Sequence, residues 1–397
     1  MRLQRVIRVL QTLTWRRPAK CQVVQFGGLE VTALSLLSDE FTIGVMPLVS
    51  EQLSLPVVLR TWIGIGFSRW AYYRAFLDMT GARVVLVWHD TTVPAYLLRQ
   101  HIAIPVFCIQ NGVRHNLGPA SGTGFLDELQ SASAHSTPTA DAYFCFGTAE
   151  PAYLDGIIET RFVPHGSFRA NAFAAGRQAH PRHQAISGIG FIVSFPSRQS
   201  IPGDSVSGNH HTFMWLGSRT ITYHEYFSFD AVVARAIYAV CQRRGLRFSI
   251  IGKRSDETSA EAQYFHDALN DRVEVLTHTK GEGYELADRF QYLVTIDSTL
   301  GYEMRALGKP VAFLANRLKL LNITDDDLTF GFPLELPTDG PYWSSATSES
   351  AIVEFLHRWL EWETHQEIRE FDFDLMRLDP GNSQLRGLIR RALAEPR

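Results

Sequence analysis

The sequence predicts an α/β protein with two Rossmann-like domains whose parallel sheets face a central cleft. Short apolar runs alternate with longer segments of helical periodicity, which is typical of parallel sheets covered by helices. This alternation breaks off near residues 170–184 and then begins again. The chain has 397 residues, a length that suits two domains of about 150–200 residues each.

The first domain is expected to span residues 1–175. Its predicted strands are the apolar runs at residues 22–26, 41–45, 84–88, 106–109 and 143–146. Each run leads into a polar or glycine-rich turn, and ligands bind at the carboxyl ends of the strands in such sheets. Residues 118–139 are rich in Gly, Ser, Ala, Thr and Pro, so we expect a mobile loop over the cleft there.

The second domain is expected to span residues 185–345, with the boundary in the break at residues 170–184. Its predicted strands lie at residues 190–195, 247–251, 273–276, 292–296 and 311–314, and its predicted helices at residues 227–244, 259–269 and 299–307. Residues 346–397 follow as a C-terminal segment with helical patterns at 350–362 and 384–393. We expect these helices to brace the domains.

The segment at residues 292–314 has the pattern of a buried strand, a polar turn, a short helix and a second strand. Asp297, Ser298 and Thr299 stand at the turn and are good N-cap residues. A helix N-terminus at the end of a parallel strand presents unpaired N–H groups and favours an anion. The segment therefore predicts a phosphate site, with Glu303 one turn into the helix to accept hydrogen bonds from sugar hydroxyls. A structural turn whose Ser and Thr only cap the helix explains the same residues equally well.

Two further turns of the second domain carry hydroxyl or cationic side chains. Ser197 and Arg198 follow its first predicted strand, and Lys253 and Arg254 follow the strand at residues 247–251. A planar guanidinium can pair with a phosphate through two hydrogen bonds. One such cation alone is more often a solvated surface residue, but three turns at strand ends are expected to converge on one crevice. These residues therefore join the predicted donor-binding set.

Residues 217–226 are polar and aromatic and lead into the predicted helix at residues 227–244. Arg219 is assigned to the donor side, and His224 could bind a base, a ribose or a reacting sugar. A lone histidine is more often structural than catalytic. Asp230, in the helix that follows, is a second candidate for the reacting carboxylate.

Asp90 is the best-placed carboxylate of the first domain, since it follows the strand at residues 84–88. A general base must reach the acceptor hydroxyl within hydrogen-bonding distance. Capping of the next helix accounts for Asp90 equally well. The neighbours expected on the acceptor side are Glu30, Asn111, Arg114 and His165.

Composition and motifs exclude several other classes of protein. The formal net charge of −3 gives no overall reason to expect a nucleic-acid partner. No zinc spacing, Walker loop or GxSxG turn is present, and the acidic triplet at residues 325–327 is typical of a solvated turn. We therefore expect no metal and no cofactor. The four cysteines are scattered, and we expect buried, reduced thiols.

The N-terminal segment has a local charge bias. Residues 1–20 hold six basic and no acidic residues, with apolar residues at helical spacing. This segment could lie on the anionic face of the inner membrane. A terminal helix packed on the first domain explains the pattern at least as well. The chain shows neither a membrane-spanning apolar run nor a signal-peptide pattern, so we expect a cytoplasmic protein.

Several strings in the chain resemble those of bacterial surface carbohydrate biosynthesis proteins, which look like GT-B glycosyltransferases. The more specific strings are Ile-Gln-Asn-Gly at residues 109–112 and Asp-Ser-Thr-Leu-Gly-Tyr-Glu at residues 297–303. Others lie at residues 141–147, 166–171, 331–333 and 340–343. The resemblance implies a GT-B fold that holds the donor nucleotide in the C-terminal domain and the acceptor in the N-terminal domain, without a catalytic metal.

The Ser-Thr pair at residues 298–299 is also similar to the phosphate site of bacterial sialyl- and Kdo-transferases, which use CMP-activated acids. Retaining β-Kdo transferases are the relatives that this similarity suggests. The chain departs from the sialyltransferase pattern because it has no clear His-Pro pair. The nearest strings are Pro-His at residues 164–165 and His-Pro at residues 180–181. This departure weakens the assignment of a CMP-activated donor.

The expected function is transfer of a sugar from a nucleotide-activated donor, with CMP-Kdo-like donors among the candidates. The expected acceptor is a glycan or lipid-linked precursor of a surface polysaccharide or lipopolysaccharide. Two alternatives stay open. One is a sugar-nucleotide 2-epimerase, which shares the paired α/β layout, and the other is a non-catalytic nucleotide-sugar-binding component of a glycan assembly complex.

Overall fold

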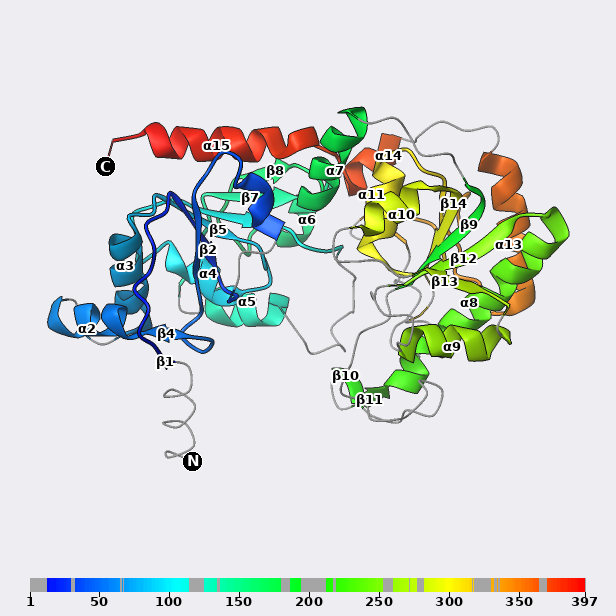
Figure 1. Cartoon of the computed structure of the whole chain (residues 1–397), viewed down its shortest axis with the longest axis horizontal. Coiled ribbons are helices and arrows are strands. Elements are labelled where there is room, and N and C mark those ends of the chain that lie inside the picture. The colour runs from blue at the N-terminus through cyan, green and yellow to red at the C-terminus, as the bar shows by residue number, and fades with distance from the viewer. Residues whose placement is uncertain are drawn as a thin grey trace.

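The computed structural model describes residues 13–396 apart from residues 30–32, 65, 67, 114–124, 134–135, 180–185, 194–211, 217–218, 253–259, 271, 277–281, 316, 318–329, 332–333, 335 and 364–369. Within these residues the chain forms two α/β domains side by side, each built around its own parallel sheet (Figure 1). The predicted fold class, two Rossmann-like domains with parallel sheets, is confirmed.

The first sheet is parallel and, among the described residues, has six strands in the order β3-β2-β5-β6-β7-β8. These strands are β2 (Val23–Phe26), β3 (Ile43–Met46), β5 (Val84–Val87), β6 (Val106–Ile109), β7 (Ala142–Cys145) and β8 (Phe162–Pro164). Every residue of β2, β5, β6 and β7 is buried, as expected for a parallel sheet that is covered on both faces. Strand β8 was not predicted, because three residues are too few to show a periodic pattern.

Helices and a short two-stranded ladder surround the first sheet. The helices are η1 (Ala33–Leu37), α2 (Leu55–Gly64), α3 (Arg69–Thr80), α4 (Val93–Leu98), α5 (Phe125–Ser133), α6 (Pro151–Leu154) and α7 (Phe168–Ala179). The ladder pairs β1 (Leu13–Thr14) with β4 (Leu53–Ser54), directly before α2. Helix α3 begins after Ser68, whose hydroxyl accepts the N–H of Ala71, and ends at Gly81 with a φ of 73°.

Two segments that were expected to be irregular contain helices. The expected loop at residues 118–139 includes α5, and the expected break at residues 170–184 includes most of α7. Their small residues resemble a loop in composition, but alanine is the best helix former. Burial of Leu129, Ala170 and Ala174 then stabilises both helices against the domain.

The second sheet is also parallel, and its described strands follow the order β13-β12-β9-β14-β15. They are β9 (Ile186–Ile192), β12 (Arg247–Ile251), β13 (Glu274–Leu276), β14 (Phe290–Thr295) and β15 (Val311–Phe313). Around this sheet lie the hairpin β10 (Thr212–Leu216) with β11 (Arg219–Thr222) and the helices α8 (Tyr223–Arg244), α9 (Ala260–Leu269), α10 (Gly283–Asp288), α11 (Thr299–Ala306), α13 (Glu349–Glu363) and α14 (Glu370–Leu375). Helix α8 starts with a capping box formed by Thr222 and Glu225.

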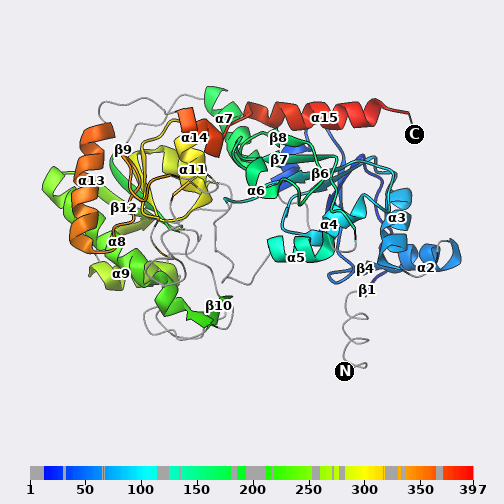
Figure 2. The same ribbon diagram turned by 180° about the vertical axis from the view of Figure 1, so that it is seen from behind.

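The C-terminal segment contacts both domains. Helix α13 packs against α8 in the second domain. After the short η4 (Pro380–Asn382), α15 (Ser383–Ala394) runs along the first domain, as the view from behind shows (Figure 2). Leu385 and Ile389 of α15 are fully buried in one cluster with Leu86 of β5 and Phe168 of α7. The chain therefore returns to its first domain after completing the second.

Candidate functional site

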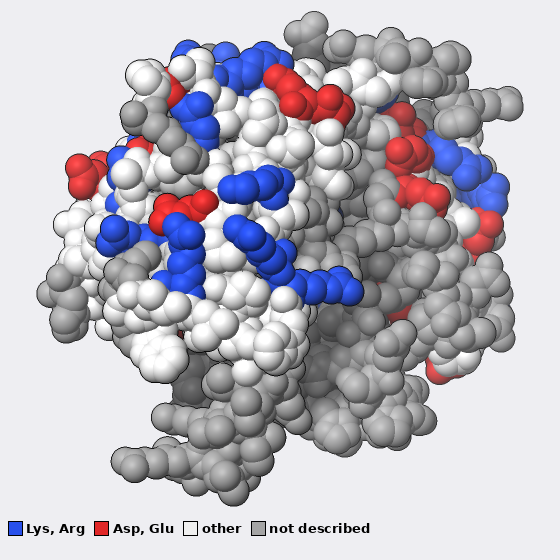
Figure 3. Space-filling model, turned by 60° about the vertical axis from the view of Figure 1, so that its left-hand side comes forward, with Lys and Arg blue, Asp and Glu red and all other residues white. Residues whose placement is uncertain are grey.

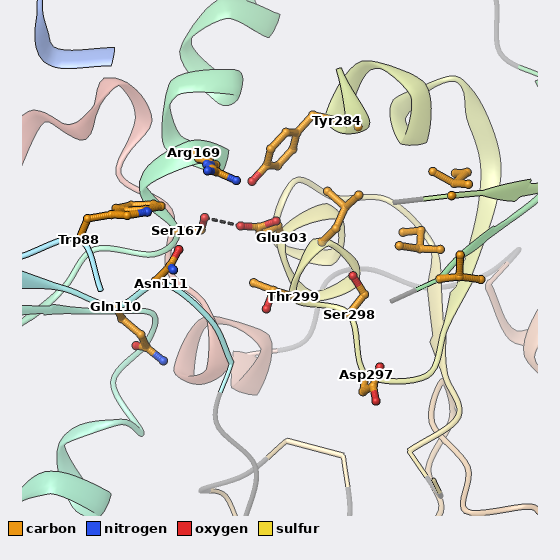
Figure 4. A pocket seen from close by; sticks show the side chains of 16 residues that line it. Trp88, Gln110, Asn111, Ser167, Arg169, Tyr284, Asp297, Ser298, Thr299 and Glu303 are labelled. Carbon is orange, nitrogen blue, oxygen red and sulfur yellow. Dashed lines mark hydrogen bonds between the residues drawn. The ribbon is translucent and has the colours of Figure 1, made fainter. Parts of the chain in front are cut away.

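A cavity of about 370 Å³ lies between the two domains, a volume typical of small-molecule sites (Figure 4). From the first domain it is lined by Trp88 after β5, by Gln110 and Asn111 after β6, and by Ser167 and Arg169 at the start of α7. From the second domain it is lined by Ile192, Val193, Ile251, Gly252, Gly283, Tyr284, residues 297–300 and Glu303. The carboxyl ends of strands from both sheets thus meet at the cavity, where such folds bind ligands.

The turn between β14 and α11 forms part of the cavity wall. Ser298 is the N-cap residue of α11, but its hydroxyl makes no capping hydrogen bond. Thr299 Oγ1 instead accepts a hydrogen bond from the backbone N–H of Val113 in the first domain, with an N–O distance of 3.3 Å. Helix capping alone therefore does not account for the Ser-Thr pair. The arrangement places the positive end of the α11 dipole at the cavity.

Gly301 allows α11 to begin close to the sheet. A Cβ atom at this position would lie 2.4 Å from Cγ2 of Thr295 and 3.2 Å from the ring of Phe313. Thr295 is fixed in turn, because its Oγ1 donates to the carbonyl of Ile192 at 3.1 Å and accepts the N–H of Ser298 at 3.2 Å. The first turn of α11 is therefore held rigidly against β9 and β14.

A buried arginine anchors the same turn. Nε of Arg317 donates to Oδ2 of Asp297 at 2.9 Å, and Nη1 donates to Oδ2 of Asp230 at 2.6 Å. Burial disfavours the charge of Arg317, but the two carboxylates outweigh this effect and raise its pKa. Asp230, a predicted catalytic carboxylate, is 1% exposed and is not among the residues that line the cavity. Asp297 lines the cavity, as predicted for the donor side, but shares its carboxylate with Arg317.

Glu303 meets the first domain across the cavity. Its carboxylate accepts a hydrogen bond from the hydroxyl of Ser167, and the side chains of Tyr284 and Arg169 point toward it (Figure 4). Burial raises the pKa of Glu303, whereas hydrogen bonds from Ser167 and Tyr284 and the charge of Arg169 oppose the rise. A carboxyl group in this setting can accept hydrogen bonds from ligand hydroxyls, and its perturbed pKa is typical of functional sites.

Asp90 lies behind the cavity wall. It is 1% exposed, its Oδ2 accepts the hydroxyl of Tyr143 at 2.6 Å, and its Oδ1 accepts the backbone N–H of Asn111 at 3.2 Å. A general base must reach its substrate, so this burial argues against the prediction that Asp90 reacts. The capping alternative is not met either, because the N-cap residue of α4 is Thr92. The bond from the backbone of Asn111, which does line the cavity, connects Asp90 to the cavity wall.

Two more predicted site residues lie away from the cavity. His165 is fully buried, with its Nε2 3.6 Å from Oδ2 of Asp379. Burial lowers the pKa of His165 to about 4, so the ring is neutral at pH 7, and its place is in the packing between α7 and the C-terminal segment. Arg219 on β11 is exposed and pairs with Glu225 at 3.8 Å. Neither residue is among those that line the cavity, and their assignments stay predictions.

Several predicted site residues lie outside the described residues. They are Glu30, Arg114, Ser197, Arg198, Lys253 and Arg254, together with the side chain of His224. The same holds for residues 1–12 and for the acidic triplet at residues 325–327. Their assignments stay predictions.

Eleven of the sixteen residues that line the cavity were absent from the predicted set, among them Trp88, Ser167, Arg169 and Tyr284. Ser167 and Arg169 lie in one of the strings that carry the family resemblance, directly after β8, and that position was the available signal. Arg169 Cζ lies 5.4 Å from the ring centre of Trp88. Tyr284 had no signal, because α10 has six residues and shows no clear helical period.

Some wider features also bear on function. Among the described residues, no group of three or more His, Cys, Asp or Glu is arranged to hold a metal ion. No helix in the described part of the chain is long and apolar enough to cross a membrane.

All four cysteines are free and buried, as predicted. Burial raises the pKa of Cys108, Cys145 and Cys241 to about 12, which keeps these thiols protonated.

One protein-family model matches most of the chain. The family is described as “putative O-antigen biosynthesis protein”, and the match covers residues 107–393. It therefore includes the first-domain side of the cavity from β6 onward and the whole second domain. A search of curated proteins gave no match.

Solved structures resemble the chain over nearly its whole length. MnaA of S. aureus, solved with UDP, has a TM-score of 0.53 at 12% identity over 94% of this chain and 96% of that chain. A “putative UDP-N-acetylglucosamine 2-epimerase” from Listeria monocytogenes has a TM-score of 0.52 at 12% identity, over 96% and 98%. The wall teichoic acid polymerase TagF has 0.50 at 10% identity, over 94% and 89%. At such identities the likeness establishes the fold, a GT-B arrangement of two Rossmann-like domains.

Proposed function

Because this chain belongs to the O-antigen biosynthesis protein family, we propose that it is a glycosyltransferase of surface polysaccharide assembly. It moves a sugar from a nucleotide-activated donor to a polysaccharide or lipopolysaccharide acceptor. The observation that carries this proposal is the turn at Ser298 and Thr299. It presents a helix N-terminus and two hydroxyls to a cavity between two parallel sheets.

In this proposal the donor phosphate lies at the start of α11. The backbone N–H groups of the first helical turn and the hydroxyls of Ser298 and Thr299 are suited to bind its oxygens. Arg169, from the first domain, adds a fixed positive charge on the opposite wall. Glu303 is suited to accept hydrogen bonds from the hydroxyls of the ribose or of the sugar, in the place that Ser167 takes in this structure.

This arrangement matches the charge that develops during glycosyl transfer. The bond between the anomeric carbon and a phosphate oxygen breaks, the acceptor hydroxyl forms the new bond and loses its proton, and the phosphate leaves with added negative charge. Positive groups aimed at that phosphate lower the barrier most effectively when they are preorganised. The helix N-terminus and Arg169 meet that need, so we propose transfer without a catalytic metal.

The proposal extends to a donor with a second anionic group. A CMP-activated acid such as CMP-Kdo carries one phosphate and one carboxylate. The start of α11 and Arg169 lie on opposite walls of the cavity, so each could hold one anion. A nucleoside diphosphate sugar would instead place both of its phosphates along the α11 turn. Calorimetry with CMP, CDP, UDP and GDP distinguishes these donors by their nucleotide.

The double substitution Ser298→Ala and Thr299→Ala tests the phosphate assignment. We expect the affinity for the preferred nucleotide to fall by about a hundredfold or more, because two hydrogen bonds to a charged group are lost, each worth roughly 1.5–3 kcal/mol. Isothermal calorimetry measures the change. Ser228→Ala on the exposed face of α8 serves as the matched control and should leave affinity unaltered. Equal affinity of the double variant and the native chain would contradict the assignment of a phosphate site to Ser298 and Thr299.

A sugar-nucleotide 2-epimerase is the second candidate, since the Listeria monocytogenes protein shares the fold. An epimerase converts its sugar nucleotide without an acceptor, whereas a transferase needs one. Incubation with UDP-N-acetylglucosamine alone, followed by NMR of the sugar, separates the two. Appearance of the 2-epimer in the absence of acceptor would replace our proposal. A non-catalytic binding component would bind the nucleotide sugar and release neither epimer nor free nucleotide when acceptor is added.

A further inference from the structure

Helix α2 carries apolar side chains on its outer face as well as on its inner face. Leu59, Trp62 and Ile63 follow the i, i+3, i+4 spacing of one helical face, and they are 45%, 71% and 85% exposed. The opposite face, with Val57 and Thr61, is buried against the domain. A surface helix normally has one apolar stripe, which faces the core, and a polar outer face. An exposed apolar face of this kind marks a surface that binds another molecule.

The exposed apolar surface continues from α2 onto the ladder in front of it. Trp15, which is 82% exposed, directly follows β1, and β1 pairs with β4 immediately before α2. The hydroxyl of Ser54 donates to the carbonyl of Arg16 at 3.0 Å and so fixes this segment beside the start of α2. Among the large apolar side chains that are exposed in the described residues, four of six belong to this one region. We call Trp15, Leu59, Trp62 and Ile63 the α2 patch.

The α2 patch lies in a basic surrounding. The exposed cations of β1, α2, α3 and the segment after β1 are Arg16, Arg17, Lys20, Arg60, Arg69 and Arg74. Residues 13–20 and 52–77 contain no acidic residue at all, although the whole chain has a net charge of −3. Figure 3 turns the side with α2 and α3 toward the viewer, and Lys and Arg side chains gather there among uncharged ones, with fewer acidic side chains between them. The basic charge is therefore concentrated locally.

We propose that the α2 patch docks the protein onto an anionic lipid surface. Tryptophan prefers the boundary between headgroups and acyl chains, and basic side chains around it add attraction to anionic lipids. A second copy of the chain fits this surface less well, because a two-fold contact would bring the same cations against one another. The surface belongs to the first domain, so docking would bring that domain to the membrane. This proposal does not depend on which reaction the cavity performs.

Vesicle flotation with the full chain tests the proposal. We expect binding to vesicles of phosphatidylglycerol and phosphatidylcholine in equal parts, much weaker binding to phosphatidylcholine alone, and loss of binding as salt is raised. Trp62→Ser with Ile63→Ser should lower the partition coefficient by at least about tenfold, because two apolar side chains no longer enter the interface. Arg60→Gln with Arg69→Gln should lower it by roughly fivefold for each charge removed.

The control is Leu36→Ser on η1, which removes an exposed apolar side chain outside the α2 patch and should leave binding unchanged. All substituted side chains are exposed, so melting temperatures of the variants should match the native chain. Undiminished binding of the Trp62 and Ile63 variant would overturn the proposal and assign membrane contact to another segment such as residues 1–12. Equal binding to neutral vesicles would overturn it as well. So would a dimer in sedimentation experiments that this variant abolishes, because the patch would then be a subunit interface.

Discussion

The substitution Arg317→Met is expected to lower the free energy of unfolding by roughly 3–5 kcal/mol, the usual effect of breaking a buried ion pair. The guanidinium joins Asp230 of α8 to Asp297 of the cavity turn, and both Arg317 and Asp230 are almost fully buried. Methionine fills much of the same space but leaves the buried carboxylate of Asp230 and the partly exposed carboxylate of Asp297 without their cation. Urea unfolding followed by circular dichroism measures the loss.

Two further variants show whether carboxylates left without their cation cause the loss of stability in Arg317→Met. Arg235→Met breaks an exposed ion pair between Arg235 of α8 and Glu349 of α13, and should cost less than about 1 kcal/mol. Adding Asp230→Asn to Arg317→Met removes one stranded charge and should restore part of the stability. If the Arg317 and Arg235 variants lose equal stability, the buried cluster does not anchor the turn.

The substitution Glu303→Gln is expected to stabilise the fold and impair the site. The raised pKa of Glu303 means that the folded protein holds the proton more tightly than the unfolded chain does. Stability is therefore lost as pH rises from the ordinary pKa of a glutamate through the raised pKa of the folded state. Glutamine does not ionise, so the variant avoids the cost of a buried negative charge, and its side-chain oxygen can still accept a hydrogen bond from the hydroxyl of Ser167. The variant should melt higher than the native chain at neutral pH, with a difference that shrinks as the solution is acidified.

The effect of the same variant on binding runs in the opposite direction. A hydrogen bond from a ligand hydroxyl to a carboxylate contributes roughly 1.5–3 kcal/mol and one to the neutral amide of glutamine roughly 0.5–1.5 kcal/mol, so sugar-nucleotide affinity should fall by about 5–10-fold. Calorimetry and scanning of thermal unfolding at several pH values measure the two effects on one sample. Glu285→Gln on the exposed side of α10 is the matched control. A Glu303→Gln variant that binds normally would remove Glu303 from the site. One that melts lower at neutral pH would show that its charge is stabilising.

Part of the cavity could be predicted because its signals are local. Asp297, Ser298, Thr299 and Glu303 lie within one strand-turn-helix segment, and Asn111 directly follows a strongly apolar strand. In a parallel sheet, such positions lead to the ligand-binding edge whatever the rest of the chain does. All five residues line the cavity.

The role of each carboxylate could not be predicted, because it depends on partners that are distant in sequence. Asp90 is bonded to a tyrosine 53 residues away, and Asp230 to an arginine 87 residues away. At the level of sequence these two residues look as available as Glu303, since each follows an apolar run or stands in a polar stretch. Their pairing and burial leave Asp297 and Glu303 as the carboxyl groups that line the cavity among the described residues.

The sequence by itself determined two parallel sheets and the strand-turn-helix segment that brings Ser298 and Thr299 to the cavity, because strand length, apolar runs and capping residues act over a few neighbouring positions. Only the tertiary structure decided which groups face each other across the cavity. Ser167 meets Glu303 across 136 residues of chain, and Val113 meets Thr299 across 186. Those contacts arise from the packing of one domain against the other, which no local pattern encodes. The outward face of α2 follows the same rule, since its spacing is visible in the sequence but its exposure depends on which side packs against the domain.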